Sequence, residues 1–393
     1  MKGMIGLQYD FDRVIDRHNT YSVKWDTSFG DRDILPLWVA DMDFQVPQPV
    51  TEALIATAKH GIFGYSDGKK VYEDAVIHWM RTRHNWEIER EWINYSPGVV
   101  PALIWAIRAF TQPGDKVVLQ SPVYPPFFRA IESNGCQVVN NQLVYAEGQY
   151  RMDLTDLEVK FAYGAKVMLL CSPHNPVGRV WRREELEDLA ALCSKYEVTV
   201  IADEIHADLV YKRYKHTTFS LVAPELAART VVCTAPSKTF NLAGLQTSNI
   251  IISDAYLRET YRKVAGQNSS FHPNTFGIAA LVAAYEHGAE WLDQLLDYLQ
   301  DNLICLQTFV NKKMPQIQVV NPEGTYLVWL DLRQLGLEPQ QLKRFMLGHA
   351  KVACNDGYTF GPGGEGFERM NIACPRATLL EALARLATAV EQL

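Results

Sequence analysis

The chain alternates between segments with the apolar spacing of helices and short segments that are almost wholly apolar. Apolar residues three or four positions apart predict helices at 48–61, 99–114 and 183–197. Gly61 ends the first of these, and Pro113 with Gly114 ends the second. Short apolar runs that finish in polar or turn residues predict strands. These runs are 115–122, 166–176, 198–206, 230–238 and 248–253.

Strands without polar alternation, separated by helices, are typical of a parallel sheet that is covered on both faces. We therefore expect an α/β fold, a mostly parallel sheet flanked by helices, over residues 46–285.

The last hundred residues have a different pattern. A long helical segment at 290–314 precedes two strand candidates, 325–332 and 367–375, and the chain closes with an amphipathic helix at 378–393. This order predicts a smaller α+β domain over 286–393. Residues 1–45 show little periodicity, and we expect them to form an N-terminal arm and part of the small domain.

Charge and cysteine content narrow the class of protein. The net charge is −7 and no lysine or arginine run is present, so nucleic-acid binding has no electrostatic footprint. No apolar run has the length of a membrane span, and the N-terminus lacks the pattern of a secretory signal. The seven cysteines form no C-x-x-C pair, which argues against a disulfide framework and against a zinc site. We expect a cytoplasmic protein without a metal site.

One motif is better explained without a ligand. Residues 361–366 read GPGGEG and match the G-x-G-x-x-G pattern of dinucleotide-binding proteins. That fingerprint needs a strand before it and a helix directly after it, whereas a proline interrupts this match and a strand candidate follows. A glycine-rich loop is the expected structure.

Four chemically unusual residues stand at the ends of predicted strands: Tyr124, Asn175, Asp203 and Lys238. Each alone has an ordinary explanation, such as a helix cap for the aspartate or a turn for the asparagine before proline. In a parallel α/β sheet, however, ligands bind beyond the carboxyl ends of the strands. An amine, a carboxylate, an amide and an aromatic ring are therefore expected to meet at one edge.

This set matches the requirements of pyridoxal 5′-phosphate. A lysine joins the cofactor aldehyde, an aspartate pairs with the pyridine nitrogen, and an aromatic ring stacks on the cofactor. The phosphate needs backbone N–H groups at a helix N-terminus, which Gly98, Val99 and Val100 would supply. Hydroxyl groups of Thr234 and Ser237 would add to this cradle.

The sequence resembles the fold-type I pyridoxal-phosphate enzymes, the aspartate aminotransferase superfamily, and more narrowly the MalY/PatB group of cystathionine β-lyase-like C–S lyases. The resemblance rests on segments spread over nearly the whole chain: PLWVADMDF, FGYS, SPVYPPF, LLCSPHNPVGRVW, DEIHADLV, SKTFNLAGLQTSN, GTYLVWLDLR and NIACPR.

The resemblance assigns roles to individual residues. It implies that Lys238 is the Schiff-base lysine, that Asp203 pairs with the pyridine nitrogen, that Asn175 donates to the ring O3′ and that Tyr124 stacks on the ring. It also implies that Arg376 binds the substrate α-carboxylate. Tyr65 would reach across the interface of a homodimer to the phosphate of the partner's cofactor.

Two positions depart from typical aminotransferases and favour a lyase. An arginine is usual eight residues after the lysine, where this chain has Gln246. A tyrosine is usual three residues after the aspartate, where this chain has His206 near O3′. The expected reaction is α,β-elimination of L-cystathionine or related cysteine thioethers to pyruvate, ammonia and a thiol. The same residues also suit an aminotransferase that uses an amino acid and a 2-keto acid, and a binding protein could keep the pocket without turnover.

Overall fold

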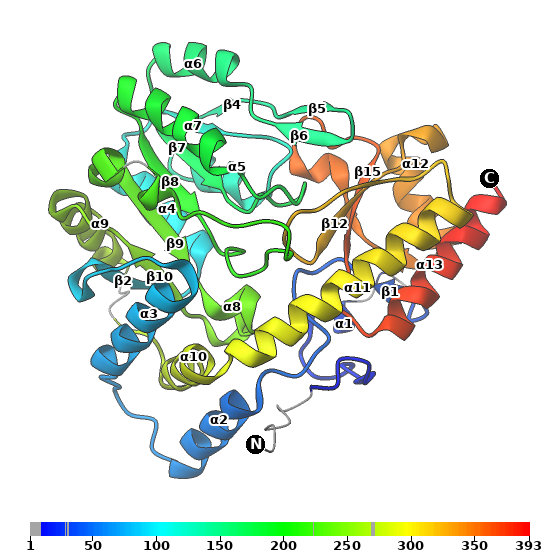
Figure 1. Cartoon of the computed structure of the whole chain (residues 1–393), viewed down its shortest axis with the longest axis horizontal. Helices are drawn as coiled ribbons and strands as arrows, with labels where there is room; N and C mark the ends of the chain where they lie inside the picture. The colour runs from blue at the N-terminus through cyan, green and yellow to red at the C-terminus, as the bar shows by residue number, and fades with distance from the viewer. Residues whose placement is uncertain (1–8, 28, 30, 223, 269–271) are drawn as a thin grey trace, which may run out of the picture.

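The computed structural model describes residues 9–27, 29, 31–222, 224–268 and 272–393, and it confirms the expected α/β fold (Figure 1). Its largest sheet has seven strands in the order β2-β10-β9-β8-β7-β3-β4. The strands are β2 (Ile93–Ser96), β3 (Lys116–Leu119), β4 (Gln137–Asn140), β7 (Ala165–Cys171), β8 (Thr199–Asp203), β9 (Thr230–Thr234) and β10 (Ser248–Ile251).

The sheet is mixed rather than wholly parallel. Strands β4, β3, β7, β8 and β9 pair in parallel, whereas β10 is antiparallel to both β9 and β2. The connection from β9 to β10 holds only α8 (Pro236–Thr239) and the short η4 (Ala243–Leu245), so no crossover helix returns the chain to the opposite edge. As a result, β2, β9, β8, β7 and β3 all present their carboxyl ends on the same side.

Helices cover both faces of the sheet, so its strands are buried on both sides. On one face the apolar core includes side chains of α4 (Val99–Phe110), α5 (Pro126–Glu132) and α9 (Ala255–Gln267). On the other face it includes side chains of α6 (Leu154–Ala162) and α7 (Arg183–Lys195).

Two more helices, α3 (Lys69–His84) and α10 (Thr275–His287), pack on each other at the edge where β2 and β10 lie (Figure 1). The preceding helix, α2 (Gln48–His60), ends at Gly61 with φ 74°, as its sequence predicts.

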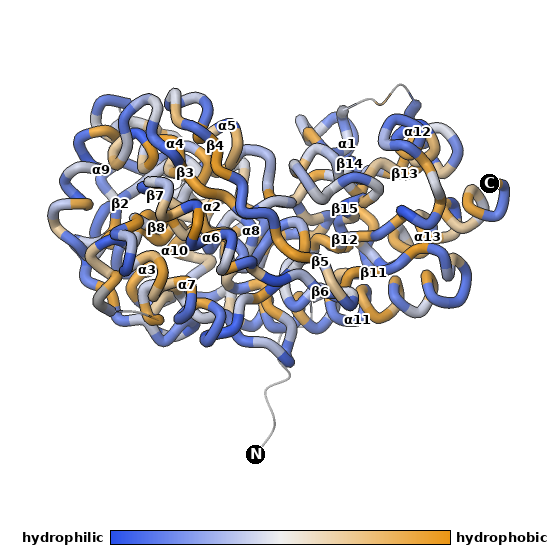
Figure 2. The backbone as a smooth tube through the Cα atoms, turned by 90° about the horizontal axis from the view of Figure 1, so that it is seen from above, coloured by the Kyte–Doolittle hydropathy of each residue, from blue (hydrophilic) through white to orange (hydrophobic). Residues whose placement is uncertain are grey.

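A smaller group of elements follows in the chain and lies beside the large sheet (Figure 2). It begins with the long helix α11 (Ala289–Lys313) and ends with α13 (Arg376–Glu391). Its sheet has the order β11-β12-β15-β14. These strands are β11 (Gln318–Val320), β12 (Leu327–Asp331), β14 (Asn355–Asp356) and β15 (Phe367–Asn371).

The N-terminal segment joins this smaller group. It contains the single-turn helix α1 (Val23–Asp26) and the strand β1 (Leu35–Pro36), neither of which its sequence pattern reveals. Strand β1 pairs in parallel with β13 (Val352–Ala353), which ties the start of the chain to its last quarter. The domain boundaries at 45 and 285 stay a prediction.

The GPGGEG segment is a loop followed directly by β15 rather than by a helix. Gly361, Gly363 and Gly366 all have positive φ values. A Cβ at Gly361 would stand 2.6 Å from the ring of Phe128, so glycine here serves both backbone conformation and close packing.

Neither a membrane-spanning helix, nor a metal-binding cluster, nor a disulfide is found among the described residues. No helix there has the length and apolar character needed to cross a membrane. No group of three or more histidine, cysteine, aspartate or glutamate side chains in the same part of the chain is arranged to hold a metal ion. All seven cysteines, which the structure describes, are free thiols.

Candidate active site

A cavity of about 220 Å³ opens at the carboxyl ends of β2, β3, β7, β8 and β9. It brings together most of the residues singled out in the sequence, from segments far apart in the chain. The predicted residues that line it are Gly98, Val99, Val100, Tyr124, Asn175, Asp203, His206, Ser237 and Lys238.

Lys238 occupies the short helix α8 directly after β9. Its Nζ donates a hydrogen bond of 2.7 Å to the carbonyl oxygen of Ala40, which also lines the cavity. Burial and the nearby charge of Arg369 together lower the pKa of this amine to about 8, against the opposing influence of Asp41 and Asp203. The neutral amine that attacks an aldehyde is therefore accessible near neutral pH.

Asp203 ends β8 and is buried. Its Oδ1 accepts a hydrogen bond from the backbone N–H of Ile205 at 3.1 Å. Burial raises the pKa of the carboxyl to about 7, against the opposing influence of that hydrogen bond and of Lys238. A protonated ring nitrogen beside it would favour the charged carboxylate, as an aspartate paired with a pyridinium requires.

Three further groups complete the cavity wall. Tyr124 is partly buried, and burial raises the pKa of its hydroxyl. Oδ1 of Asn175 accepts a hydrogen bond from Arg369. The other end of this amide, Nδ2, therefore remains as a hydrogen-bond donor. His206 is buried, and its Nδ1 has no hydrogen-bond partner among the described residues.

The N-terminus of α4 forms the remaining wall. Gly98 is its N-cap, and Val99 and Val100 begin its first turn. No side chain of the described residues caps this helix, and its first turn contains no acidic residue. The backbone N–H groups are thus available to an anion, and the helix dipole favours negative charge there.

These groups fit pyridoxal phosphate. The cavity offers an amine with an accessible neutral form, a buried carboxylate, an amide donor, an aromatic ring and a helix N-terminus. The unpartnered Nδ1 of His206 is a further sign that a polar ligand belongs here, because buried polar atoms in proteins are nearly always hydrogen-bonded.

Three predicted residues lie elsewhere. Thr234 is buried, but its Oγ1 accepts from Nδ2 of Asn249 at 3.3 Å across the β9–β10 pair and does not reach the cavity. Tyr65 is fully exposed between α2 and α3, as a residue used by another chain would be, and its role stays a prediction.

The position of Arg376 does not fit its predicted role as the residue that binds the substrate α-carboxylate. Arg376 is the first residue of α13 and does not line the cavity. Its Nε donates to Oδ1 of Asn302 at 2.7 Å, and its guanidinium lies 5.3 Å from the ring centroid of Tyr298. The structure therefore does not bring this side chain to the candidate active site.

Arg369 is the arginine that the structure places next to the cavity. It is buried in β15, and its Nη1 donates to Oδ1 of Asn175 at 2.8 Å. Its Nη2 donates to the Trp38 carbonyl at 3.1 Å and to Asn355 Oδ1 at 2.5 Å, whereas its Nε has no partner among the described residues. The signal in the sequence is that two charged residues, Glu368 and Arg369, stand inside a predicted strand.

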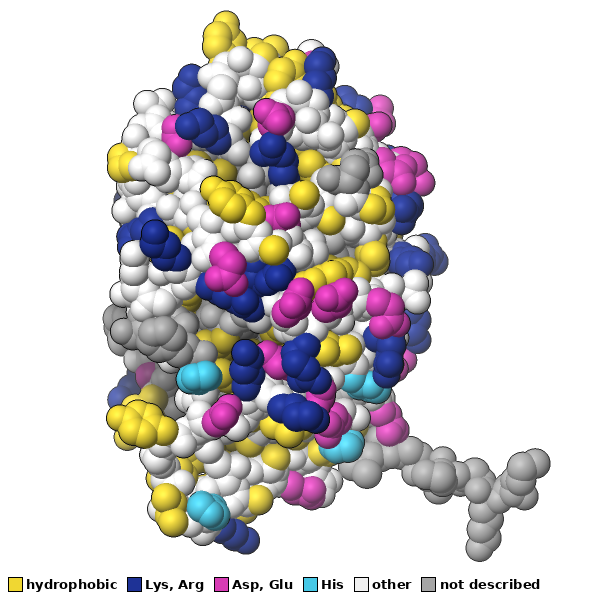
Figure 3. Space-filling model, turned by 90° about the vertical axis from the view of Figure 1, so that its left-hand side faces the viewer, with side chains coloured by type: hydrophobic (Ala, Val, Ile, Leu, Met, Phe, Trp, Pro, Cys, Tyr) yellow, Lys and Arg dark blue, Asp and Glu magenta, His cyan; other side chains and the backbone are white. Residues whose placement is uncertain are grey.

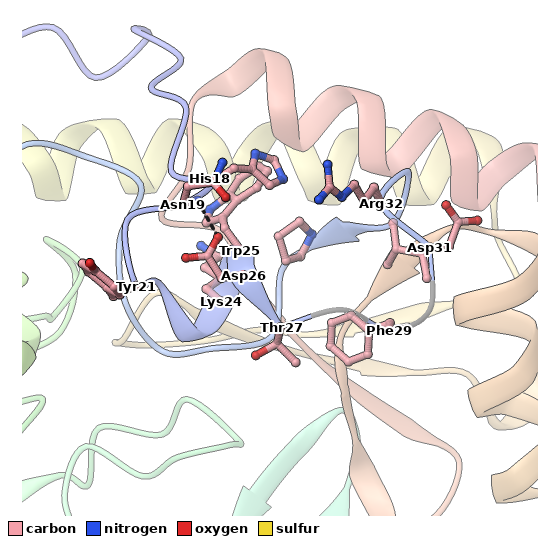
Figure 4. A pocket seen from close by; sticks show the side chains of 12 residues that line it. His18, Asn19, Tyr21, Lys24, Trp25, Asp26, Thr27, Phe29, Asp31 and Arg32 are labelled. Carbon is pink, nitrogen blue, oxygen red and sulfur yellow. Dashed lines mark hydrogen bonds between the residues drawn. The ribbon is translucent and has the colours of Figure 1, made fainter.

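The segment after Lys238 turns one side chain outward and the next one into the cavity. Gln246 is exposed and adopts φ 52°, while the adjacent Thr247 is buried and lines the cavity. A separate cavity of about 510 Å³ lies around α1 in the N-terminal segment and shares no lining residue with the Lys238 cavity (Figure 4).

Comparison with known proteins agrees with this geometry. The model of the family "Aminotransferase class I and II" matches residues 32–386. Cystathionine beta-lyase PatB of Bacillus subtilis is 44% identical over 97% of this chain and 100% of its own length.

Two solved structures have the same fold as this chain over almost its whole length. Cystalysin from Treponema denticola, which contains a pyridoxal 5′-phosphate cofactor, has a TM-score of 0.96 and 38% identity over 98% of this chain and 100% of its own. The pyridoxal-phosphate-bound C–S lyase from Staphylococcus hominis has a TM-score of 0.92 and 31% identity over 98% of this chain and 99% of its own. The chain belongs to the aminotransferase class I and II family and, within it, to the cystathionine β-lyase-like group that includes PatB.

Proposed function

We propose that this protein cleaves the carbon–sulfur bond of L-cystathionine or related cysteine S-conjugates and releases pyruvate, ammonia and a thiol. As a member of its group, the chain is a pyridoxal-phosphate-dependent C–S lyase. The observation that carries the proposal is the convergence of Lys238, Asp203 and the α4 N-terminus on one cavity. We also propose a cytoplasmic location, which the seven free thiols support.

We assign Lys238 two tasks. Its amine binds the cofactor aldehyde and, once the substrate amine has displaced it, takes the proton from the substrate Cα. Pyridoxal phosphate, when bound, supplies an electron sink for the carbanion that this proton transfer creates. The negative charge of Asp203 would keep the nearby ring nitrogen protonated, and a protonated ring accepts electrons more readily. The electron pair of the Cβ–S bond leaves with sulfur, and one water molecule converts the remaining carbon skeleton to pyruvate and ammonium.

We propose Arg369, rather than Arg376, as the partner of the substrate α-carboxylate. Arg369 is bonded to the cavity residue Asn175, and its Nε lacks a partner among the described residues. A guanidinium group binds a carboxylate best through two parallel N–H donors. Burial lowers the pKa of Arg369 to about 10, so the group stays cationic at neutral pH.

We further propose a homodimer whose sites are shared between chains. The connection between α2 and α3 exposes Ile62, Phe63 and Tyr65, and Phe63 stacks on Phe276 at a centroid distance of 5.6 Å. Large apolar side chains gathered on one exposed segment are typical of an interface, and two-fold symmetry is its commonest form.

Nucleic acid is not an expected partner. Charges of both signs are interspersed on the face of the molecule shown in Figure 3. That face therefore lacks the single-sign patch that nucleic acid requires.

The deciding experiment supplies L-cystathionine to the cofactor-loaded protein without any 2-keto acid. Equal amounts of pyruvate and homocysteine over many turnovers would support the lyase. If no thioether yields pyruvate, and amino transfer runs for many turnovers once a 2-keto acid is added, the protein is an aminotransferase instead. An inactive protein that still binds the cofactor would point to a binding role.

A further inference from the structure

The aperiodic segment at residues 38–44 forms a structured loop beside the candidate active site. The carbonyl oxygen of Ala40 accepts two hydrogen bonds, one from Lys238 Nζ at 2.7 Å and one from the Tyr326 hydroxyl at 3.0 Å. Nδ2 of Asn371 donates at 2.6 Å to each of the neighbouring carbonyls, those of Val39 and Asp41. The position of the Lys238 amine thus depends on how this loop is held.

Ionic contacts from the N-terminal arm hold the loop from its other side. Arg17 grips Asp41 through two hydrogen bonds of 3.1 and 2.8 Å, and it also bonds Asp43 at 2.6 Å. Lys24, which is fully buried, places its Nζ 2.7 Å from Asp43 and 3.7 Å from Asp41. Trp25, drawn beside Lys24 in Figure 4, donates from Nε1 to Asp43 at 2.9 Å.

This cluster also sets charge near the lysine. The Asp41 carboxylate is one residue from Ala40, and its charge raises the pKa of Lys238. Arg17 is the cation that neutralises most of the Asp41 charge, because it is the partner in direct bidentate contact. The other charged or titratable groups that act on the Lys238 amine or lie around it in the cavity are Asp203, Arg369, Tyr326, His206, Tyr124 and Cys171.

We propose that Arg17 and Asp41 are positioning residues for Lys238: together they fix the Ala40 carbonyl that receives its amine and determine how much negative charge that amine experiences. This inference rests on the proposed role of Lys238 as the residue linked to the cofactor. It gives the N-terminal arm a part in the chemistry, although Arg17 and Asp41 themselves do not line the cavity.

The test is a spectrophotometric pH titration of the Lys238–cofactor linkage, without substrate, in two variants. Arg17→Gln removes the cation beside Asp41, so the titration midpoint should rise. Asp41→Asn removes the anion and keeps the shape of the side chain, so the midpoint should fall. Shifts of about half a pH unit or more, in opposite directions, are expected for charges this close in a partly buried site. Arg17→Lys keeps the charge and should restore most of the native midpoint.

A matched control separates positioning from stability. Asp12→Ala removes a different anchor of the same arm, the 2.5 Å hydrogen bond from the Tyr298 hydroxyl, and does not touch the loop. It should lower the thermal unfolding midpoint and leave the titration unchanged. Midpoints that match the native value in both Arg17→Gln and Asp41→Asn, or that move in the same direction, would overturn the inference. A linkage band that survives in Lys238→Ala would instead refute the role of Lys238 itself.

Discussion

Lys238 shows how burial turns an ordinary side chain into a reagent. Its amine is buried in the cavity and lies near the cation of Arg369, and both influences favour the neutral form. Neither influence can be read from neighbouring letters in the sequence, since Arg369 is more than a hundred residues away. The sequence identifies the lysine because it stands directly after a predicted strand, whereas the lowered pKa of its amine results from the fold.

A pH dependence follows from this environment. The folded pKa of about 8 lies below the ordinary value of 10.5, so the amine loses its proton earlier as the pH rises. In the cofactor-free protein, capture of pyridoxal phosphate should accelerate with pH and level off just above pH 8. Stopped-flow absorbance between about pH 6 and pH 10 would measure this, with Lys238→Ala as the blank. A rate that keeps rising beyond pH 10 would contradict a perturbed lysine.

The two arginines make a second test at the same scale. Arg369→Gln should lower kcat/KM by about tenfold to a hundredfold, chiefly through a higher KM, because a charged hydrogen bond to the substrate carboxylate contributes roughly 1.5–3 kcal/mol. Arg376→Gln should change kcat/KM little. Steady-state kinetics on both variants decides between them, and the reverse outcome would restore Arg376 as the carboxylate partner.

At the scale of elements, Arg376 belongs to a joint between α11 and α13. The buried side chain of Asn302, in α11, donates to the carbonyls of Ile372 and Cys374 at 3.0 and 2.9 Å. Its Oδ1 accepts from Arg376 at 2.7 Å. One amide thus joins the long helix, the end of the β15 segment and the start of the last helix.

Removing that amide should cost stability. Asn302→Ala leaves two buried carbonyl groups and one guanidinium nitrogen without their partner, so the free energy of unfolding should fall by about 2–4 kcal/mol. Urea denaturation would measure the change. Gln307→Ala, which removes an exposed hydrogen bond to Asn321 from the same helix, is the matched control and should have a much smaller effect. Equal losses of unfolding free energy in the two variants would show that the Asn302 contacts stabilise the fold no more than an exposed hydrogen bond does.

The limits of sequence reading are clearest at this scale. Asp203 and Asn175 were predictable because each ends or follows an apolar run, and such positions gather at one edge of a parallel sheet. Arg369 was not, because it stands inside a strand and meets Asn175 only when two separate sheets pack together. The antiparallel direction of β10 was hidden as well, since an apolar strand reads alike in either direction.

The N-terminal arm shows a different limit. Its contribution to the cavity is the backbone carbonyl of Ala40, a group that every residue possesses. Its own elements, α1 and β1, span only a few residues each, too short to show periodicity. The loop belongs to PLWVADMDF, one of the segments that carry the family resemblance, but its side chains do not indicate that its backbone binds the Lys238 amine.

For the whole molecule, the main prediction concerns assembly. Tyr65→Phe and Lys238→Ala should each be inactive as pure proteins. After subunit exchange, half of the dimers are mixed and each contains one site with both residues intact, so roughly a quarter of native activity should return. Activity measured against the mixing ratio provides the check. Full activity in a monomer by light scattering, or no recovery after proven exchange, would count against a shared site.

The cavity is assembled from residues as distant as Ala40 and Thr247, with Arg369 bonded to it from another sheet. No contiguous fragment of the chain can therefore reproduce it, and a ligand that occupies it binds only the globally folded state. Such binding stabilises the fold by mass action, by about 2.7 kcal/mol when the free ligand is at a hundred times its dissociation constant. Cofactor supply should thus govern how long the protein survives heat or proteases, and the cofactor-free chain is the form most exposed to degradation.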